Sequence, residues 1–569
     1  MDVSPLLKLP LELIALVCSY LPIRDIKSLR LAGRATASSV KLRIHRVFLS
    51  ASPKDVDVFR CVAEHEYYRL HVREIIWDDA VLSNDDRDRD RDRDSDSDRD
   101  SETANDKGCP HWFATACEEN VHHLKAWYRE DLRVDTETIV ARLLPLSVSW
   151  AYFCRWRQQQ QRVIQSGADV SAFAFGLAQF PSLCSIEVTP AMHGRTLKFP
   201  LYATPAIRAL PDGLNYPLRP GWMATEEAAP QTFMPAWVED GAGCSPDGMW
   251  RGAIACLQLL AQAIRATSGA EEARAPLTIT RLAFDAHYLD AGLNCRMFDQ
   301  PCRTYDNLLA VLRQPGMRSF HLALSVGGEE NRNWHAFRSM QLCKALDAIG
   351  PDLEELAITT DIQMDNLETW LFLGPERRAI GHHVPLRTIF SAGLERRWPR
   401  LKTLRLSGFL VTKDDLLGLL ASLPPSLRRL ELGDLRFLAS DQEDAEQTSS
   451  NSWHGLLCAM RDTLGWRERP ADQRVYVTAW FTTFLGCRRP GRITRADECI
   501  NAFLYGDGAD PFTPGNVVAF HLRTDAETEI DDAFDPEYRR PNKGPKELME
   551  LGYIRKDPFF FPELRQTPN

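Results

Sequence analysis

The second half of the chain repeats a short apolar pattern, apolar-x-x-apolar-x-apolar. The pattern begins at Ile279, Met317, Leu353, Leu401 and Leu427 and continues through Leu282 and Phe284, Phe320 and Leu322, Leu356 and Ile358, Leu404 and Leu406, and Leu430 and Leu432. The last two copies start 26 residues apart, at 401 and 427. A period of about 20–29 residues is typical of repeats that each supply a strand and a short helix. Such a unit cannot bury its apolar side alone, so the pattern predicts stacked units whose strands line one concave surface.

The spacing of the repeats is irregular. Earlier copies start 38, 36 and 48 residues apart, as the positions 279, 317, 353 and 401 show, so insertions are expected between them. Thr412 and Asp415 precede the segment LLGLLASL, which predicts a capped helix between the last two strands. The segment 474–481, RVYVTAWF, predicts one more strand. The alternative is an α/β domain in which helices and strands simply alternate.

The N-terminal region has the signals of short helices. Pro10 suits the start of a helix, and apolar residues follow it at helical spacing, namely Leu13, Leu16, Val17, Tyr20 and Leu21. Pro22 ends this helix. A second helix carries Ile23, Ile26 and Leu29, with Asp25 in its first turn and Gly33 after its end. The apolar residues Val40, Leu42, Ile44, Val47 and Phe48 predict a third element.

Composition divides the remainder of the chain. We expect a helix and a strand at 51–83, and a disordered segment rich in Arg, Asp and Ser at 84–107, which has almost no apolar residue. A helix- and loop-rich region at 108–250 comes next, with its loops mainly after residue 180. The repeat region then spans 251–500, beginning with a helix at 250–266, and an irregular tail occupies 501–569.

Charge and cysteine content limit the classes of partner. The chain has 569 residues, a formal net charge of -10 and a pI near 5.8, so nucleic acid and anionic membranes are not expected as main partners. Its 14 cysteines are too few for a disulfide scaffold in a chain of this length. No basic leader and no apolar stretch of about 18 residues is present, so we expect a cytoplasmic or nuclear protein.

Motifs for catalysis and cofactor binding are missing from the sequence. It has no Gly-x-Gly-x-x-Gly, no phosphate-binding Gly-x4-Gly-Lys-Ser/Thr and no Gly-x-Ser-x-Gly. One local group of thiols and imidazoles has no common zinc-finger spacing; it consists of Cys109, His111, Cys117, His122 and His123. We therefore expect no catalytic residues, no cofactor and no metal. Paired arginines such as Arg396-Arg397 and Arg428-Arg429 would suit a phosphorylated partner if they shared a face.

Residues 9–34, LPLELIALVCSYLPIRDIKSLRLAGR, resemble the F-box motif, in a spelling similar to that of fungal F-box proteins. The matching positions are Leu9, Pro10, Glu12, Leu13, Val17, Tyr20, Leu21, Asp25, Ile26, Leu29 and Leu31. The segment up to about residue 80 is similar to the one that follows the motif in those families, and 401–435 resembles their leucine-rich stretch. Gly33 and Thr36 depart from the family pattern.

This resemblance implies a fold and a function. The fold is α/β (α+β), with a short three-helix F-box at 5–50 followed by an irregular leucine-rich-repeat-like solenoid. The function is substrate recognition in an SCF-type (Skp–cullin–F-box) E3 ubiquitin ligase, with a Skp-family adaptor, a cullin/RING ligase and an unknown protein substrate as partners. The resemblance implies these adaptor-binding residues, some of which would instead pack the helices together: Leu9, Pro10, Glu12, Leu13, Val17, Leu21, Pro22, Asp25, Ile26 and Leu29.

Two other classes of function stay open on the sequence. In one, the F-box binds its adaptor without any ubiquitination, as a scaffold or regulatory module. In the other, the chain is an enzyme whose site is assembled from distant residues. A polar site with several strongly shifted acids or bases would favour the enzyme.

Overall fold

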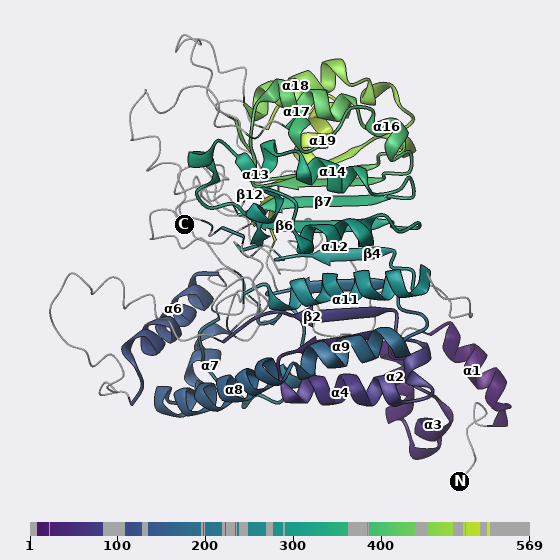
Figure 1. Ribbon diagram of the computed structural model, residues 1–569, viewed down its shortest axis with the longest axis vertical. Coiled ribbons are helices and arrows are strands. Elements are labelled where there is room, and N and C mark those ends of the chain that lie inside the picture. The colour runs from purple at the N-terminus through teal and green to yellow at the C-terminus, as the bar shows by residue number, and fades with distance from the viewer. Residues whose placement is uncertain are drawn as a thin grey trace, which may run out of the picture.

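The computed structural model places helices along one face of a long, mainly parallel β-sheet (Figure 1). It describes residues 8–21, 23–82, 108–127, 135–194, 197, 200–218, 222, 234, 236–237, 249–268, 277–287, 289, 291–361, 384, 386–437, 452–481, 493–495, 497–511 and 521–523. The predicted mixed α/β class is confirmed, and the strands form a mainly parallel sheet. Among the described helices, none has the length and apolar character needed to cross a membrane.

Strand order in the sheet follows chain order. The parallel strands are β1 (Arg46–Ser50), β2 (Glu74–Asp78), β3 (Ser185–Thr189), β4 (Arg281–Phe284), β6 (Ser319–Ser325), β7 (Glu355–Thr360), β8 (Thr403–Ser407), β10 (Arg429–Gly433) and β12 (Tyr476–Phe481). β13 (Ile493–Arg495) and β14 (His521–Arg523) extend the sheet in antiparallel fashion. Short β5 (Leu293–Asn294) pairs with β6, and β9 (Leu410–Val411) pairs with β11 (Arg436–Phe437).

Helices connect most of these strands and form a second layer. They are α4 (Pro53–Glu64), α9 (Ala168–Gln179), α11 (Arg251–Ser268), α12 (Arg303–Leu312), α14 (Gln341–Asp347), α17 (Lys413–Ala421), α18 (Trp453–Thr463) and α19 (Asp497–Tyr505). Shorter helical pieces lie between them: α10 (Pro205–Arg208), α13 (His335–Arg338), α16 (Leu394–Arg397), η2 (Tyr68–Leu70), η4 (Cys295–Phe298), η5 (Glu329–Arg332), η7 (Leu386–Thr388), η8 (Trp466–Glu468) and η9 (Ala471–Gln473). Neighbouring helices pack in the same order as their strands.

An apolar ladder on alternate strand residues joins the two layers. In each strand the residues at two fixed positions point toward the helices, because side chains alternate between the faces of a sheet. Leu282, Phe320, Leu356, Leu404 and Leu430 form one row in register, and all are almost completely buried. The five predicted repeat segments are therefore adjacent strands. Each segment also begins on a buried apolar residue that lies two positions before its strand.

The same apolar pattern extends further toward the N-terminus than the sequence indicated. Val72, Ile75 and Trp77 carry it through β2, and Leu183 and Ile186 carry it into β3. The sheet therefore starts at β1, well before residue 251, where the repeat region was expected to begin. Strand β3 falls within the stretch after residue 180 that was expected to be mainly loops. The inserted segments between these strands hide their common spacing.

Three short helices precede the sheet. They are α1 (Leu11–Ser19), α2 (Ile23–Leu31) and α3 (Arg34–Ser39). The third helix lies earlier than predicted, since Val40 already has extended backbone and Val47 and Phe48 belong to β1. All five residues of β1 are buried, and the strand pairs with β2 in parallel register.

The chain between β2 and β3 forms a separate group of helices with an aromatic core. These helices are α6 (His111–Trp127), α7 (Thr136–Ala141) and α8 (Leu146–Ser166), and α6 projects to one side of the sheet (Figure 1). Phe113, Phe153 and the thiols of Cys109 and Cys117 are buried in its core. The segment 84–107 that was expected to be disordered lies outside the described residues. The tail predicted to be irregular from residue 501 instead contains the end of α19 and the strand β14, and residues beyond 523 lie outside the described part.

The ladder predicts where the fold is most sensitive to truncation. Leu404→Ala removes a fully buried side chain from the central row, and a core Leu→Ala change costs about 2–5 kcal/mol of unfolding free energy. Leu70→Ala, at a half-exposed site, is expected to cost less than about 0.5 kcal/mol. Urea unfolding followed by circular dichroism measures both values. Equal losses in the two variants would contradict the ladder.

Candidate functional site

Helix α1 carries apolar residues on two neighbouring faces. Ile14 and Cys18, one helical turn apart, are buried against Ile26 and Val40 in a small core of their own. A second stripe consists of Leu13, Leu16, Val17 and Tyr20, and all four are exposed. Residues at i, i+3, i+4 and i+7 share one side of a helix. The helix therefore uses one apolar face for packing and presents the other to solvent.

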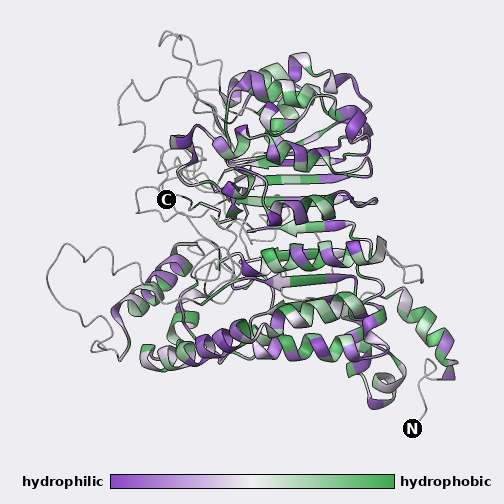
Figure 2. Cartoon of the chain, in the orientation of Figure 1, coloured by the Kyte–Doolittle hydropathy of each residue, from purple (hydrophilic) through white to green (hydrophobic). Residues whose placement is uncertain are grey.

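This exposed stripe is unusual within the described part of the chain. Of the thirteen large apolar side chains exposed there, seven lie between residues 9 and 31: Leu9, Leu11, Leu13, Leu16, Val17, Tyr20 and Leu31. Figure 2 shows the apolar character of α1 at the edge of the molecule. Contiguous exposed apolar surface commonly marks a protein interaction site, whereas single exposed apolar residues do not.

The ten residues assigned to the adaptor-binding motif fall into three groups. The exposed members are Leu9, Pro10, Glu12, Leu13, Val17 and Asp25. Leu21 and Leu29 are half-buried beside the small core, and Ile26 is fully buried within it. Pro22 lies outside the described residues. The first group is positioned for direct contact, and Ile26 can act only by holding the helices together.

Sequence periodicity alone did not separate these groups. The predicted apolar face (Leu13, Leu16, Val17, Tyr20 and Leu21) contained the four residues of the exposed stripe, whereas the buried Ile14 and Cys18 were not assigned to it. Successive residues are only about 100° apart around a helix, so two adjacent apolar faces merge into one broad signal. The exposed Leu11 and Leu16 were not among the assigned site residues, which came from the resemblance to the F-box motif.

Two arginines fix the orientation of the N-terminal helices. Arg43 donates from its guanidinium to the carbonyl oxygens of Cys18 (2.9 Å) and Leu21 (3.4 Å), near the end of α1. Arg30 donates to the carbonyls of Ala37 (2.8 Å) and Val40. The last carbonyls of a helix have no partner within it, and a cation stabilises that end. The hydrogen bonds from Arg43 thus fix the end of α1, the helix that carries the exposed stripe.

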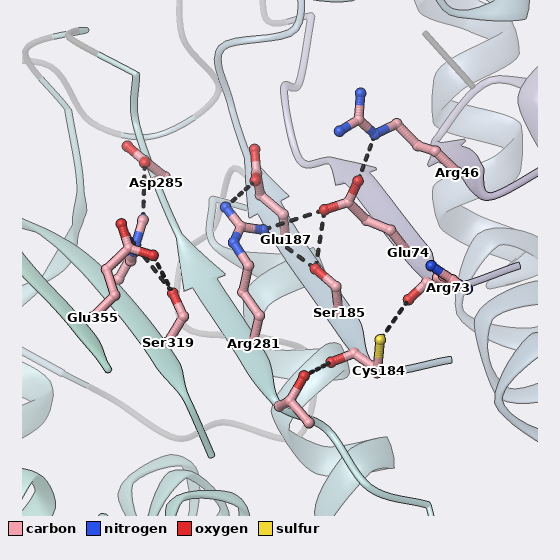
Figure 3. A network of polar contacts seen from close by, with 12 residues as sticks. Arg46, Arg73, Glu74, Cys184, Ser185, Glu187, Arg281, Asp285, Ser319 and Glu355 are labelled. Atoms are coloured by element: carbon pink, nitrogen blue, oxygen red, sulfur yellow. Dashed lines mark hydrogen bonds and ion pairs between the residues drawn. The ribbon is translucent and has the colours of Figure 1, made fainter. Parts of the chain in front are cut away.

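The second candidate surface is the face of the sheet that points away from the helices, which we call the polar face. Charged residues follow one another across it from β1 to β7, as Figure 3 shows, and further pairs lie on β8 and β10. Arg46, Glu74, Ser185, Arg281 and Ser319 occupy the same register position in successive strands. Because adjacent strands lie about 4.8 Å apart, long side chains reach from one strand to the next.

Ion pairs link these residues into a continuous network. Arg46 Nε lies 2.5 Å from Glu74 Oε2, and Arg281 lies 3.4 Å from Glu74 and 2.8 Å from Glu187. His287 Nε2 lies 2.6 Å from the other Glu187 oxygen. The positive groups therefore alternate with the negative ones, and each carboxylate meets at least one cation.

The network continues across β6 and β7. His321 Nδ1 lies 3.6 Å from Asp285 Oδ2, and its Nε2 lies 3.2 Å from Glu355 Oε1. Ser319 donates its hydroxyl to Glu355 over 2.9 Å. Further along, Glu431 binds Arg405 at 2.7 Å and Arg429 at 2.6 Å.

Mutual pairing shifts the pKa values of these groups strongly. Burial alone would raise the pKa of Glu187, but His287 and Arg281 hold it far below its usual range. Burial would likewise raise the pKa of Glu355, yet the hydrogen bond from His321 lowers it to about 2. The pKa of His321 is raised, because its two carboxylate partners outweigh the opposing effect of burial.

Shifted acids and bases can mark an active site, but ion-pair networks shift pKa values too. Here each shifted carboxylate or imidazole has its opposite charge within the network itself. The network therefore stabilises the sheet without needing a substrate. It does not assign an acid, a base or a nucleophile to any reaction.

Other residues noted in the sequence have structural settings. Cys109 and Cys117 are buried in the aromatic cluster, and His111 lies 3.4 Å from the hydroxyl of Thr115. Arg397 and Arg429 pair with Asp347 and Glu431. In the described chain, one group of metal-ligating side chains does converge, and the sequence did not indicate it; it consists of His454, Cys458 and Asp510.

Comparison with known proteins identifies no relative. No protein-family model matches the chain, and a search of curated proteins returns no match.

The network predicts a pH dependence that has two limbs. His321, with a pKa raised above its ordinary 6.5, contributes stability that is complete below pH 6.5 and is lost as pH rises through the raised pKa. Glu355, lowered from 4.5 to about 2, contributes stability above pH 4.5 that is lost as pH falls toward 2. Urea unfolding between about pH 3 and pH 9 should show both losses.

Two histidine variants, one in the network and one outside it, test the contribution of His321 to the pH dependence. His321→Gln is expected to be less stable than wild type at acidic pH and to show a smaller alkaline loss, because His287, whose pKa is also raised, keeps its own contribution. His122→Gln, an exposed position on α6, is expected to follow the wild-type profile. An unchanged profile in His321→Gln would contradict the assigned role of the network.

Proposed function

We propose that the chain is the substrate-recognition subunit of an SCF-type E3 ubiquitin ligase. In this proposal the N-terminal helices bind a Skp-family adaptor, which connects the chain to a cullin and a RING-bound conjugating enzyme. The sheet-and-helix body captures a protein substrate. The observation that carries the proposal is the exposed apolar stripe on α1, formed by Leu13, Leu16, Val17 and Tyr20.

The stripe has the physical properties of a docking surface. Leu13, Leu16 and Val17 keep roughly half of their area exposed, and fully burying such a side chain contributes about 1.5–3 kcal/mol. Covering the remaining half would supply about 1 kcal/mol per residue on the same scale. Helices that bind in grooves present anchors at i, i+3, i+4 and i+7, which is the spacing of this stripe.

The body supports the second part of the proposal. We interpret it as a leucine-rich-repeat-like solenoid, because successive strands share one apolar register and stack through their helices. Repeat arrays of this kind commonly bind partners along the surface that their strands form. On the polar face, Arg429 lies directly beside Tyr476 in register, and both are exposed. Arg and Tyr are enriched among residues that dominate binding energy.

No catalytic group is required of the chain in this role. The partner proteins carry out ubiquitin transfer, and the chain acts by holding a substrate lysine near the activated ubiquitin. Tethering of this kind raises the effective concentration of the two reactants. The proposal places the protein in the cytoplasm or the nucleus, where this ligase system operates.

The adaptor contact is tested by placing charge in the stripe. The full chain and a Leu13→Asp, Val17→Asp double variant are compared for binding to a purified Skp-family adaptor by calorimetry. Each carboxylate would be buried without a partner in the complex, which costs several kcal/mol. We expect binding to fall at least about 100-fold, which corresponds to about 2.7 kcal/mol.

The control for this experiment is Val148→Asp, on the exposed surface of α8. It introduces the same chemical change far from the stripe along the chain and should leave adaptor binding unchanged. If the folded wild-type chain does not bind the adaptor, or if the stripe variant binds as wild type does, the proposal fails.

The ligase role is tested separately from adaptor binding. The adaptor-bound chain is mixed with the cullin, RING protein, conjugating enzyme, activating enzyme, ATP and ubiquitin. Because proximity drives transfer, we expect ubiquitin conjugates on lysines of the chain itself, and none with the Leu13→Asp, Val17→Asp variant. A chain that binds the adaptor but excludes the cullin would instead be a non-ubiquitinating scaffold.

A further inference from the structure

Three side chains of different chemistry converge where α18 packs against α19. His454 and Cys458 lie one turn apart on α18, and Asp510 follows the end of α19. His454 Nδ1 lies 2.7 Å from Asp510 Oδ2, and Cys458 Sγ lies 4.0 Å from His454 Nδ1 and 3.9 Å from Asp510 Oδ2. None of these residues belongs to the polar network or to the exposed stripe.

The local sequence explains this convergence. Ser452 caps α18 by accepting a hydrogen bond from the Gly455 amide over 3.1 Å, and residues four apart on a helix project from the same face. After α19, the amides of Gly506 and Gly508 both donate to the Ala502 carbonyl. A Cβ on Gly508 would lie only 2.7 Å from the carbonyl carbon of Ala502. Glycine thus permits the tight turn that brings Asp510 to α18.

We propose that His454, Cys458 and Asp510 form a Zn²⁺-binding site. An imidazole, a thiolate and a carboxylate are the three side-chain ligand types that zinc uses. A point equidistant from three atoms separated by 2.7, 4.0 and 3.9 Å lies about 2.1 Å from each, close to the ~2.0–2.3 Å of Zn–N, Zn–O and Zn–S bonds. Two anionic ligands balance the charge of the ion, and opening the 2.7 Å contact between His454 Nδ1 and Asp510 Oδ2 would let water complete a four-coordinate site.

The three side chains are partly enclosed. Asp510 has only 5% of its side chain exposed, while His454 has 38% exposed and leaves a route for the ion.

A cysteine nucleophile is the competing interpretation of the same residues. It requires the imidazole to take the thiol proton directly, with about 2.6–3.2 Å between heavy atoms and somewhat more for sulfur. Cys458 Sγ is instead 4.0 Å from both ring nitrogens of His454. These distances favour metal binding over an activated thiolate.

The site lies near one end of the sheet. Terminal units of stacked arrays lack one neighbour and need separate stabilisation. Zinc would join α18 to the segment after α19 and so stabilise this end. The inference is independent of adaptor binding.

The test uses the full chain, stripped of metal with a chelator and titrated with Zn²⁺ alone. We expect one ion per chain, release of a proton on binding, and a higher melting temperature with zinc. Cys458→Ser should weaken binding at least about tenfold. Cys61→Ser, at an exposed cysteine on α4, should bind as wild type does.

Cobalt identifies the ligands independently of stability. Co²⁺ in the wild-type chain and in Cys61→Ser should give a thiolate-to-metal charge-transfer band, and Cys458→Ser should lack it. His454→Gln and Asp510→Asn should change the ligand-field spectrum. Absence of stoichiometric binding, or equal affinity and an equal charge-transfer band in Cys458→Ser, would overturn the proposal.

Discussion

The burial of one apolar ladder against a layer of helices is the interaction on which the fold depends. Leu282, Phe320, Leu356, Leu404 and Leu430 are in register, and each is almost fully buried. A strand and helix taken from this array would leave their apolar sides in water, so each unit needs its neighbours. Because the strands pair in parallel and connections between parallel strands are right-handed, each new unit is added on the same side of the previous one.

This arrangement also explains why charge collects on the opposite face. Side chains alternate along a strand, so the residues between the ladder positions all point away from the helices. In parallel register they form rows, and like charges in neighbouring strands would repel. Arg46, Glu74, Glu187 and Arg281 instead pair across three strand boundaries. The pairs remove that repulsion and leave a polar surface that can discriminate among charged partners.

The sequence predicted the strands whose ladder residues are unmistakable. Leu401 to Leu406 and Leu427 to Leu432 spell the pattern clearly, and Thr412 caps the helix between them as expected. β2 and β3 have the same pattern at Val72 and Leu183, but long inserted segments separate them, so no common period links them. Their membership of the sheet depends on contacts between residues far apart in sequence.

The candidate sites were predictable to different degrees. Local spacing located the helix that bears Leu13 and Val17, because a helical face involves neighbours along the chain. It could not show that the face with Ile14 and Cys18 is the buried one, since that depends on where Ile26 and Val40 pack. His454 and Asp510 are 56 residues apart, and only the packing of α18 on α19 brings them together.

Hydrogen exchange of the full chain with and without a Skp-family adaptor tests the central claim most directly. The account predicts slower exchange in the amides of α1 and α2 and unchanged exchange in the strands of the sheet, because the adaptor covers the exposed stripe and leaves the ladder untouched. Binding accompanied by protection elsewhere, with α1 unchanged, would contradict the claim that this stripe is the docking surface.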